Sequence, residues 1–118
     1  MFKININYII VSLGLNKETN QIEYYVVFTD PTGKLPSIEL IKDQTLLDAR
    51  GLICKQYLDL ELHWIDDQLL DINNDKDTIN IYYMCRLPIE TKINNGQFFP
   101  ISSQFFPDPV VQKAIRYA

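Results

Sequence analysis

Oxygen-bearing side chains recur along the run from Asp71 to Asp77, and carboxylate and amide oxygens are the ligands that Ca²⁺ binds. A calcium loop of this kind needs glycine at its sixth position and a bidentate glutamate at its twelfth. The chain has Lys76 and Tyr82 at these positions. Because the sharp turn and the bidentate ligand are both missing, we interpret the run as a solvated turn between two strands.

Histidine and thiol chemistry has few candidates in this chain. His63 is the only histidine, and beside Trp64 in a predicted strand it is more typical of a packed or surface residue than of a catalytic base. No serine or cysteine has a recognisable base and orienting acid. Cys54 and Cys85 lie far apart in a predicted helix and a predicted strand, so we expect buried reduced thiols rather than a disulfide or a metal pair.

Composition limits the class of protein. The chain has 118 residues, 47% of them apolar and 22% charged, which predicts one globular domain spanning residues 1–118. The net charge of −4 and the scattered lysines and arginines argue against a dedicated nucleic-acid binder. No run approaches the roughly 20 apolar residues of a membrane span, and the first residues alternate as a strand does. We therefore expect a cytoplasmic protein without a membrane partner.

The first half of the chain predicts a strand hairpin and a capped helix. Strands are expected at 4–15 and 22–28, both apolar on two faces and paired antiparallel. Asp30-Pro31-Thr32-Gly33 is a strong turn signal, and 34–42 reads as a short link. The helix spans 45–59, with Thr45 and Asp48 forming a capping box. Its sheet-facing side is expected to comprise Leu46, Ala49, Ile53 and Tyr57, widened by Leu47, Cys54 and Leu58.

A glycine lies inside that helix. Gly51 costs about 1 kcal/mol relative to alanine. Close packing of a neighbouring element against Gly51 is the expected reason for its presence.

The second half predicts further strands and a closing helix. A strand interrupted at Asp66-Asp67 is expected over 60–72, a turn over 73–77, and a clear alternating strand over 78–87. A polar loop follows at 90–96. The last helix should open at Asp108-Pro109, an N-cap followed by proline at the first helical position.

This order of elements resembles the Nudix family across nearly the whole chain. Three local matches carry the resemblance: Leu35-Pro36 before the helix, the strand from Thr78 to Pro88, and the aromatic-x-Pro segment from Phe98 to Phe106. The resemblance implies an α/β (α+β) fold, with a Nudix-like mixed β-sheet sandwiched between helices. It also implies a substrate cleft and a metal-binding box.

The metal-binding box is the point at which this chain departs from the family. Such proteins typically cleave nucleoside diphosphates linked to another group, using Mg²⁺ held by the glutamates of a loop-helix box. Aligned on Leu35-Pro36, the positions of the box glutamates, the Arg-Glu pair and the last glycine hold Gln44, Leu52, Ile53, Gln56, Tyr57 and Asp59. An alternative register on Gly33 and Glu39 fails at Leu47-Asp48 and Gly51-Leu52. We therefore expect no standard Nudix reaction, no metal and no cofactor.

Acidic residues outside the box positions leave a divergent hydrolase as one hypothesis. Glu39, Asp43 and Asp48 could gather near the family's metal site and support a divergent Mg²⁺-dependent nucleoside-diphosphate hydrolase. The simpler interpretation makes them solvated loop and capping residues.

Aromatic side chains are the candidate contacts for a ligand or partner. The segment Phe98, Phe99, Phe105 and Phe106 fits either an arm packed over the sheet or an exposed patch for another chain. In the family's cleft, Tyr24, Tyr25, Trp64 and Tyr82 could stack a base, although sheet packing explains each of them singly.

Two functional hypotheses rank above the divergent hydrolase. The leading one is a catalytically inactive Nudix-like domain that acts as a protein-interaction or structural module, through a protein partner or as a homo-oligomer, including a role within a viral or phage assembly. The alternative is a metal-independent nucleotide or ADP-ribose sensor.

Overall fold

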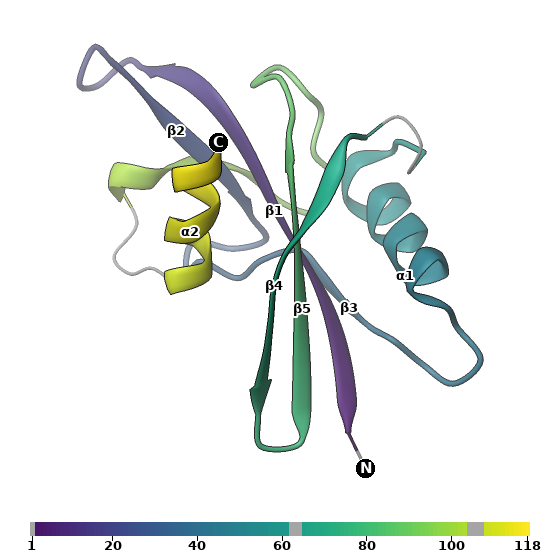
Figure 1. Ribbon diagram of the computed structural model, residues 1–118. Coiled ribbons are helices and arrows are strands. Elements are labelled where there is room, and N and C mark those ends of the chain that lie inside the picture. Colours follow the sequence, from purple (N-terminus) through teal and green to yellow (C-terminus); the bar gives the residue numbers. More distant parts are fainter. Residues whose placement is uncertain (1, 62–64, 104–107) are drawn as a thin grey trace.

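A mixed β-sheet with a helix on each face forms the frame of the molecule (Figure 1). The computed structural model describes residues 2–61, 65–103 and 108–118. In chain order the elements are β1 (Lys3–Asn16), β2 (Gln21–Phe28), β3 (Ser37–Glu39), α1 (Leu46–Ile53) with a π-helical extension (Cys54–Leu58), β4 (Asp67–Asp75), β5 (Thr78–Arg86), β6 (Gln97–Pro100), a 3₁₀ turn (Ile101–Ser103) and α2 (Pro109–Tyr117).

The long strand β1 lies at the centre of the sheet. The strand order is β4-β5-β1-β2-β6, and β3 also pairs with β1. β1 runs parallel to β5 from Lys3 to Val11, and antiparallel to β2 from Val11 to Asn16. The sheet is therefore mixed, and the two ends of β1 have different neighbours.

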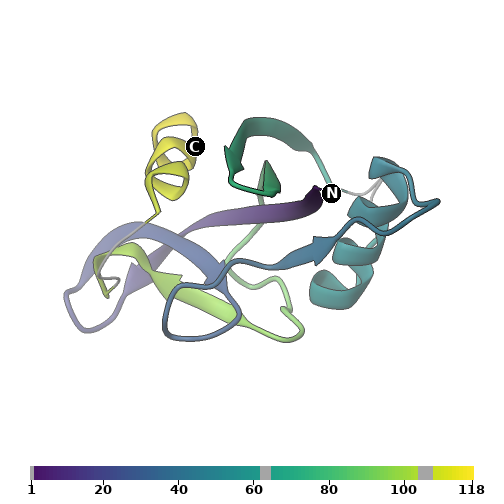
Figure 2. The same cartoon turned by 90° about the horizontal axis from the view of Figure 1, so that it is seen from below.

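The alternation of β1 divides the core into two layers. Ile6, Tyr8 and Ile10 face the layer beneath α1, where Ala49, Ile53, Cys54, Tyr83 and Cys85 are also buried. Ile9 and Val11 face the opposite layer, which α2 covers with Val110, Val111 and Ala114. Figure 2 shows α2 above the β1–β2 hairpin and α1 at the opposite end of the sheet.

Both helices begin where their capping residues predict. Thr45 Oγ1 accepts a hydrogen bond from the backbone N–H of Asp48 at 3.1 Å, and Asp48 Oδ2 accepts one from the N–H of Thr45 at 3.1 Å. Asp108 Oδ1 accepts from the N–H of Val110 at 3.0 Å. The predicted hairpin, the Asp30–Gly33 turn and the strand after Thr78 are also confirmed.

Four predictions about local structure are wrong. The link 34–42 contains β3, which pairs with β1 at Asn5–Asn7. The strand expected from residue 60 begins at Asp67. It ends at Asp75, inside the turn expected over 73–77, because the polar residues 73–75 lie on an exposed edge strand that needs no apolar alternation. Leu46 and Leu47 are 41% and 62% exposed rather than packed on the sheet. No described atom beyond the adjoining residues and backbone of its own helix lies within 4 Å of a Cβ built on Gly51, so no neighbouring element within the described residues packs against it.

Within the described residues, no helix is long and apolar enough to cross a membrane.

Candidate functional site

The inner side of α1 is tied to the sheet by a polar cluster. Arg50 Nη2 lies 2.5 Å from Asp67 Oδ1, and the Tyr8 hydroxyl donates a hydrogen bond to the other oxygen of the same carboxylate. The Arg50 guanidinium also lies 4.2 Å from the centre of the Tyr83 ring. Burial and the hydrogen bond to Asp67 raise the pKa of Tyr8 above its usual value. The cluster joins α1, β1 and the start of β4, and its groups satisfy one another.

The two cysteines are buried free thiols, as the sequence predicts. Burial raises the pKa of Cys54 to about 11. Burial also raises the pKa of Cys85 above its ordinary value. Since the thiolate is the reactive form, neither thiol is suited to nucleophilic chemistry at neutral pH.

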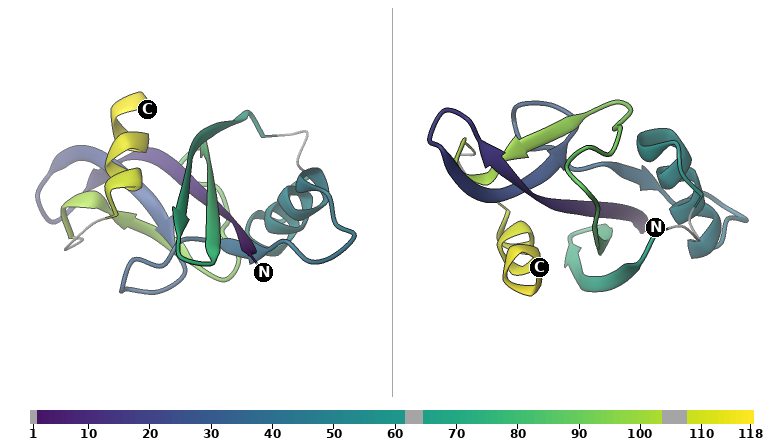
Figure 3. Two further views of the ribbon diagram at one scale, coloured as in Figure 1. Left: turned by 60° about the horizontal axis from the view of Figure 1, so that its bottom comes forward. Right: turned by 90° about the horizontal axis from the view of Figure 1, so that it is seen from above.

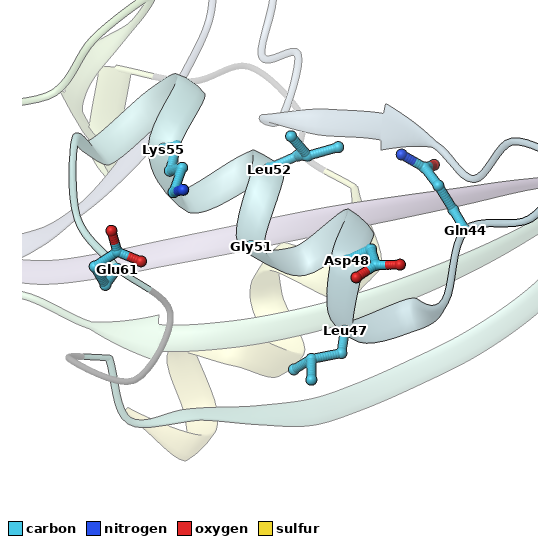
Figure 4. A pocket seen from close by; sticks show the side chains of 7 residues that line it. All are labelled: Gln44, Leu47, Asp48, Gly51, Leu52, Lys55 and Glu61. Atoms are coloured by element: carbon cyan, nitrogen blue, oxygen red, sulfur yellow. The ribbon is translucent and has the colours of Figure 1, made fainter.

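The outer side of α1 carries an open hollow of about 710 Å³, shown in Figure 4. Gly51 lies at its centre, with Asp48 towards one end and Lys55 towards the other. Leu47 and Leu52 lie on opposite sides of Gly51 and are 62% and 43% exposed. Gln44 and Glu61 complete the lining. Most of the lining surface is therefore aliphatic, with one charge of each sign close to the glycine.

The positions aligned with the box glutamates are occupied differently. Tyr57 is buried, and its hydroxyl donates to the carbonyl oxygen of Ser37 at 3.4 Å. Gln56 is exposed, and its backbone carbonyl accepts a hydrogen bond from Asn95 at 3.1 Å. Both residues belong to the π-helical turn that ends α1, where they contribute packing and a loop contact.

The candidate acids occupy three separate local settings. Glu39 belongs to β3, Asp43 adopts a left-handed backbone conformation with φ 70°, and Asp48 completes the capping box. In the segments that the structure describes, no three His, Cys, Asp or Glu side chains come together as a possible metal site. The run from Asp71 to Asp75 is strand rather than a ligand loop.

The candidate aromatic residues do not converge on one cleft. Tyr24 packs with the α2 layer, and its neighbour Tyr25 points to the opposite face of β2. Tyr82 is 7% exposed and belongs to the core beneath α2. Phe98 packs against the α1 layer, and Phe99 packs against Phe28 with ring centres 6.0 Å apart. Trp64, Phe105, Phe106 and also His63 lie outside the described residues.

A projecting part of the hairpin is the surface that sequence reasoning missed. β5 pairs with β1 only as far as Val11, and β6 pairs with β2 only as far as Tyr25. Residues 12–16 and 21–24 therefore form a two-stranded ribbon beyond the rest of the described sheet, also seen in Figure 3. On its α2-facing side Leu13, Leu15 and Ile22 are 55%, 53% and 73% exposed. The signal available in the sequence was that Leu13 and Leu15 lie near the end of β1 and Ile22 lies near the start of β2.

The base of the ribbon has a smaller hollow next to the end of α2. Its volume is about 380 Å³, and its lining includes Leu13, Tyr24, Leu87 and Pro88. Arg86 is the charged side chain in this lining, and it donates a hydrogen bond to the backbone carbonyl of Tyr117. The hollow thus continues the apolar side of the ribbon towards α2.

Solved structures show what this chain is similar to. No family model and no curated protein matches the sequence. A mutT/nudix family protein from Listeria innocua superposes with a TM-score of 0.71 at 11% identity, covering 97% of this chain and 92% of that one. This chain has the Nudix fold.

Two further solved structures share this Nudix fold. The NUDIX domain of Shewanella oneidensis NrtR, complexed with ADP ribose, has a TM-score of 0.65 at 9% identity and covers 99% of this chain and 88% of that chain. A chain of the complex between the C-terminal domain of mouse MUTYH and human PCNA has a TM-score of 0.65 at 12% identity, covering 98% of this chain and 86% of that chain. At these identities the likeness concerns the fold.

Proposed function

We propose that this chain is a Nudix-fold protein-interaction module without hydrolase activity, and that it binds a protein partner through the α2-facing side of the β1–β2 ribbon. The observation that carries the proposal is the exposed row formed by Leu13, Leu15 and Ile22. A two-stranded ribbon is marginally stable by itself in water, and contiguous exposed apolar side chains mark interaction surfaces. A partner that covers this side would stabilise the ribbon.

The neighbouring structure indicates the chemistry of the partner. α2 covers the inner part of the same sheet face with Val110, Val111 and Ala114. An amphipathic helix from the partner, placed in line with α2, would cover the outer part in the same way. Because Arg86 is the charged residue lining the hollow at this junction, we infer that the helix carries an acidic side chain beside its apolar stripe.

The lack of hydrolase activity is supported by the side chains on α1. Holding Mg²⁺ against a pyrophosphate needs several carboxylates on one helix face. The outward face of α1 instead presents Leu47, Gly51 and Leu52, and Asp48 is the one carboxylate of this helix. The NrtR domain complexed with ADP ribose supplies the alternative of nucleotide sensing. Against it, Tyr82 is buried in the core beneath α2, and Tyr25 lies on the opposite face of β2 from Tyr24, so these side chains offer no shared open surface on which a base could stack.

Site-specific photocrosslinking in cells tests the ribbon. A photoreactive residue is placed at Leu15, at Ile22 or, as a control, at Leu69. Leu69 lies on the edge strand β4 and is 55% exposed, which matches Leu15 at 53%. We expect positions 15 and 22 to capture the same protein and position 69 to capture none of it.

The captured protein is then purified, and its affinity is measured by calorimetry. Leu15→Glu with Ile22→Glu should weaken binding at least about 30-fold, corresponding to about 2 kcal/mol. The matched control is Leu69→Glu with Ile72→Glu, which should bind as the unmodified chain does. Equal capture from all three positions, or equal affinity of both double variants, would contradict the proposal.

A further inference from the structure

We propose that two copies of this chain associate through the outer face of α1, crossing antiparallel over Gly51. The contact is separate from the ribbon and does not depend on a partner protein. It is inferred from an unexplained glycine, from the shape of the hollow above it and from the order of the charges around it.

No contact within the described part of the chain explains why position 51 holds a glycine. A glycine inside a helix is less favourable than alanine by about 1 kcal/mol. Its backbone is helical, and a Cβ at this position would meet no described atom within 4 Å beyond the adjoining residues and backbone of its own helix. A residue without a side chain lets a second backbone approach closely. In the proposed dimer, a second copy of the chain supplies this backbone.

The hollow is complementary to itself under a two-fold rotation. The axis would pass through the hollow near Gly51 and point out of the helix face in Figure 4. This rotation exchanges the two ends and the two sides of the hollow. Leu52 of one copy then lies beside Leu47 of the other, and the two Gly51 backbones face each other. A two-fold contact of this kind uses the same patch on both copies.

Asp48 and Lys55 follow the same symmetry. Asp48 precedes the glycine by three residues and Lys55 follows it by four, so the rotation places each Asp48 at the end of the hollow that holds the other copy's Lys55, with Glu61 beyond it. Lys55 takes part in no ion pair with the residues described. The capping box uses Asp48 Oδ2, and a carboxylate has the capacity to accept further hydrogen bonds. Two equivalent ion pairs would therefore flank the crossing point.

The size of the element sets the expected strength. α1 has 8 residues and its π-helical extension has 5. A contact limited to this helix lies at the small end of specific interfaces, so we expect dissociation in the micromolar range. The dimer should consequently form or dissociate within concentrations accessible to solution measurements.

Sedimentation equilibrium of the purified chain from about 5 to 500 μM tests the dimer. The unmodified chain should pass from monomer to dimer in this range. Lys55→Glu, which places two carboxylates opposite each other, should weaken association at least 10-fold. Gly51→Gln should abolish association while the monomer stays folded, since glutamine favours helix. The matched control Lys92→Glu makes the same charge change at an exposed loop position and should leave association unchanged.

Disulfide trapping provides a positive test of the geometry. A disulfide needs Cα atoms about 4.4–6.8 Å apart, a separation that a crossing over two glycines provides. Under mild oxidation Gly51→Cys should crosslink to a dimer much faster than Lys92→Cys, since the native thiols are buried. A chain that stays monomeric at 500 μM, or Gly51→Cys crosslinking no faster than Lys92→Cys, would overturn the proposal. So would a dimer that Leu15→Glu with Ile22→Glu dissolves and Gly51→Gln does not.

Discussion

At the scale of single residues, the cluster of Arg50, Asp67 and Tyr8 is the polar interaction whose loss should lower the free energy of unfolding most. The side chain of Asp67 is 7% exposed and that of Arg50 is 21% exposed. Removing one member of a buried ion pair leaves the other charge without its partner in the core. The cluster therefore restricts what can replace Arg50, even though this residue lies on a helix whose outer face is free.

We predict that Arg50→Met lowers the free energy of unfolding by about 2 kcal/mol, because it leaves the Asp67 carboxylate unpaired. Adding Asp67→Leu should recover part of this loss. The comparison is Lys113→Met, whose 4.0 Å contact with Asp71 is much more exposed and whose loss should cost less than about 1 kcal/mol. Urea denaturation at pH 7 measures all three. Equal losses for Arg50→Met and Lys113→Met would contradict the assigned role.

The two thiols predict a loss of stability in alkaline solution. Burial raises the pKa of Cys54 to about 11, so the folded chain keeps a proton that the unfolded chain releases near the ordinary thiol value. The contribution of this thiol to the free energy of unfolding is therefore fully present below the ordinary thiol pKa. It is lost as pH rises towards 11, by about 1.4 kcal/mol per pH unit for one thiol. Cys85, whose pKa burial also raises, acts in the same direction.

Urea denaturation between pH 8 and 10 measures this slope. The variant with Cys54→Ala and Cys85→Ala has a smaller free energy of unfolding at neutral pH because of the cavities it creates. Its decline should nevertheless begin only near pH 10, where tyrosines ionise in the unfolded chain. Parallel curves for the variant and the unmodified chain would rule out the thiols as the cause.

At the scale of elements, local signals predicted what local interactions determine. The capping box of Thr45 and Asp48, the Asp108-Pro109 helix start and the alternation of the strand after Thr78 were all confirmed. β3 could not be predicted because its 3 residues carry no periodicity and form a strand only against β1. The end of β4 was missed because a turn and a polar edge strand share the same residue types.

The exposed surfaces were also beyond the sequence pattern. Leu47 and Leu13 are apolar residues in amphipathic or buried-looking elements, and each is more than half exposed. Their exposure depends on where a neighbouring element stops, which is a tertiary property. Both candidate contacts, the ribbon and the hollow on α1, are made of such residues.

Glycine substitutions separate packing from helix propensity. Gly51→Ala should raise the free energy of unfolding by about 0.5–1 kcal/mol, because the new Cβ meets open space and alanine favours helix. Gly14→Ala should destabilise, since its Cβ would lie 3.0 Å from the Tyr25 ring and 3.2 Å from Ile89. Thermal melting at a concentration where the chain is monomeric compares the two. A lower midpoint for Gly51→Ala would show that an intramolecular neighbour occupies the hollow.

At the scale of the whole molecule, fold and activity have to be tested separately. The Nudix fold was predicted from the order of elements and is confirmed by the solved structures. The absence of hydrolysis was inferred from side chains and stays a prediction. It rests on the residues that replace the box glutamates, in particular Gln44, Gln56 and Tyr57.

A nucleotide panel tests that prediction directly. The chain is melted with ADP-ribose, nucleoside diphosphates and dinucleotides, each with and without Mg²⁺, and the reaction products are measured in parallel. We expect no product and no shift of the midpoint, whereas a ligand at 100 times its dissociation constant would add about 2.7 kcal/mol. A shift without Mg²⁺ would instead favour the sensor. Turnover that Asp48→Asn abolishes would establish the divergent hydrolase.

The central place of β1 also affects how the chain is made. This strand is synthesised well before β5, yet Lys3 pairs with Thr78 and Val11 with Arg86. Translation proceeds at about 5–20 residues per second, so the nascent strand spends several seconds outside the ribosome before its parallel neighbour exists. The apolar run around Ile9, Ile10 and Val11 has the composition that favours intermolecular β-stacking. Efficient production of this protein should therefore depend on a chaperone that shields β1 until β5 emerges.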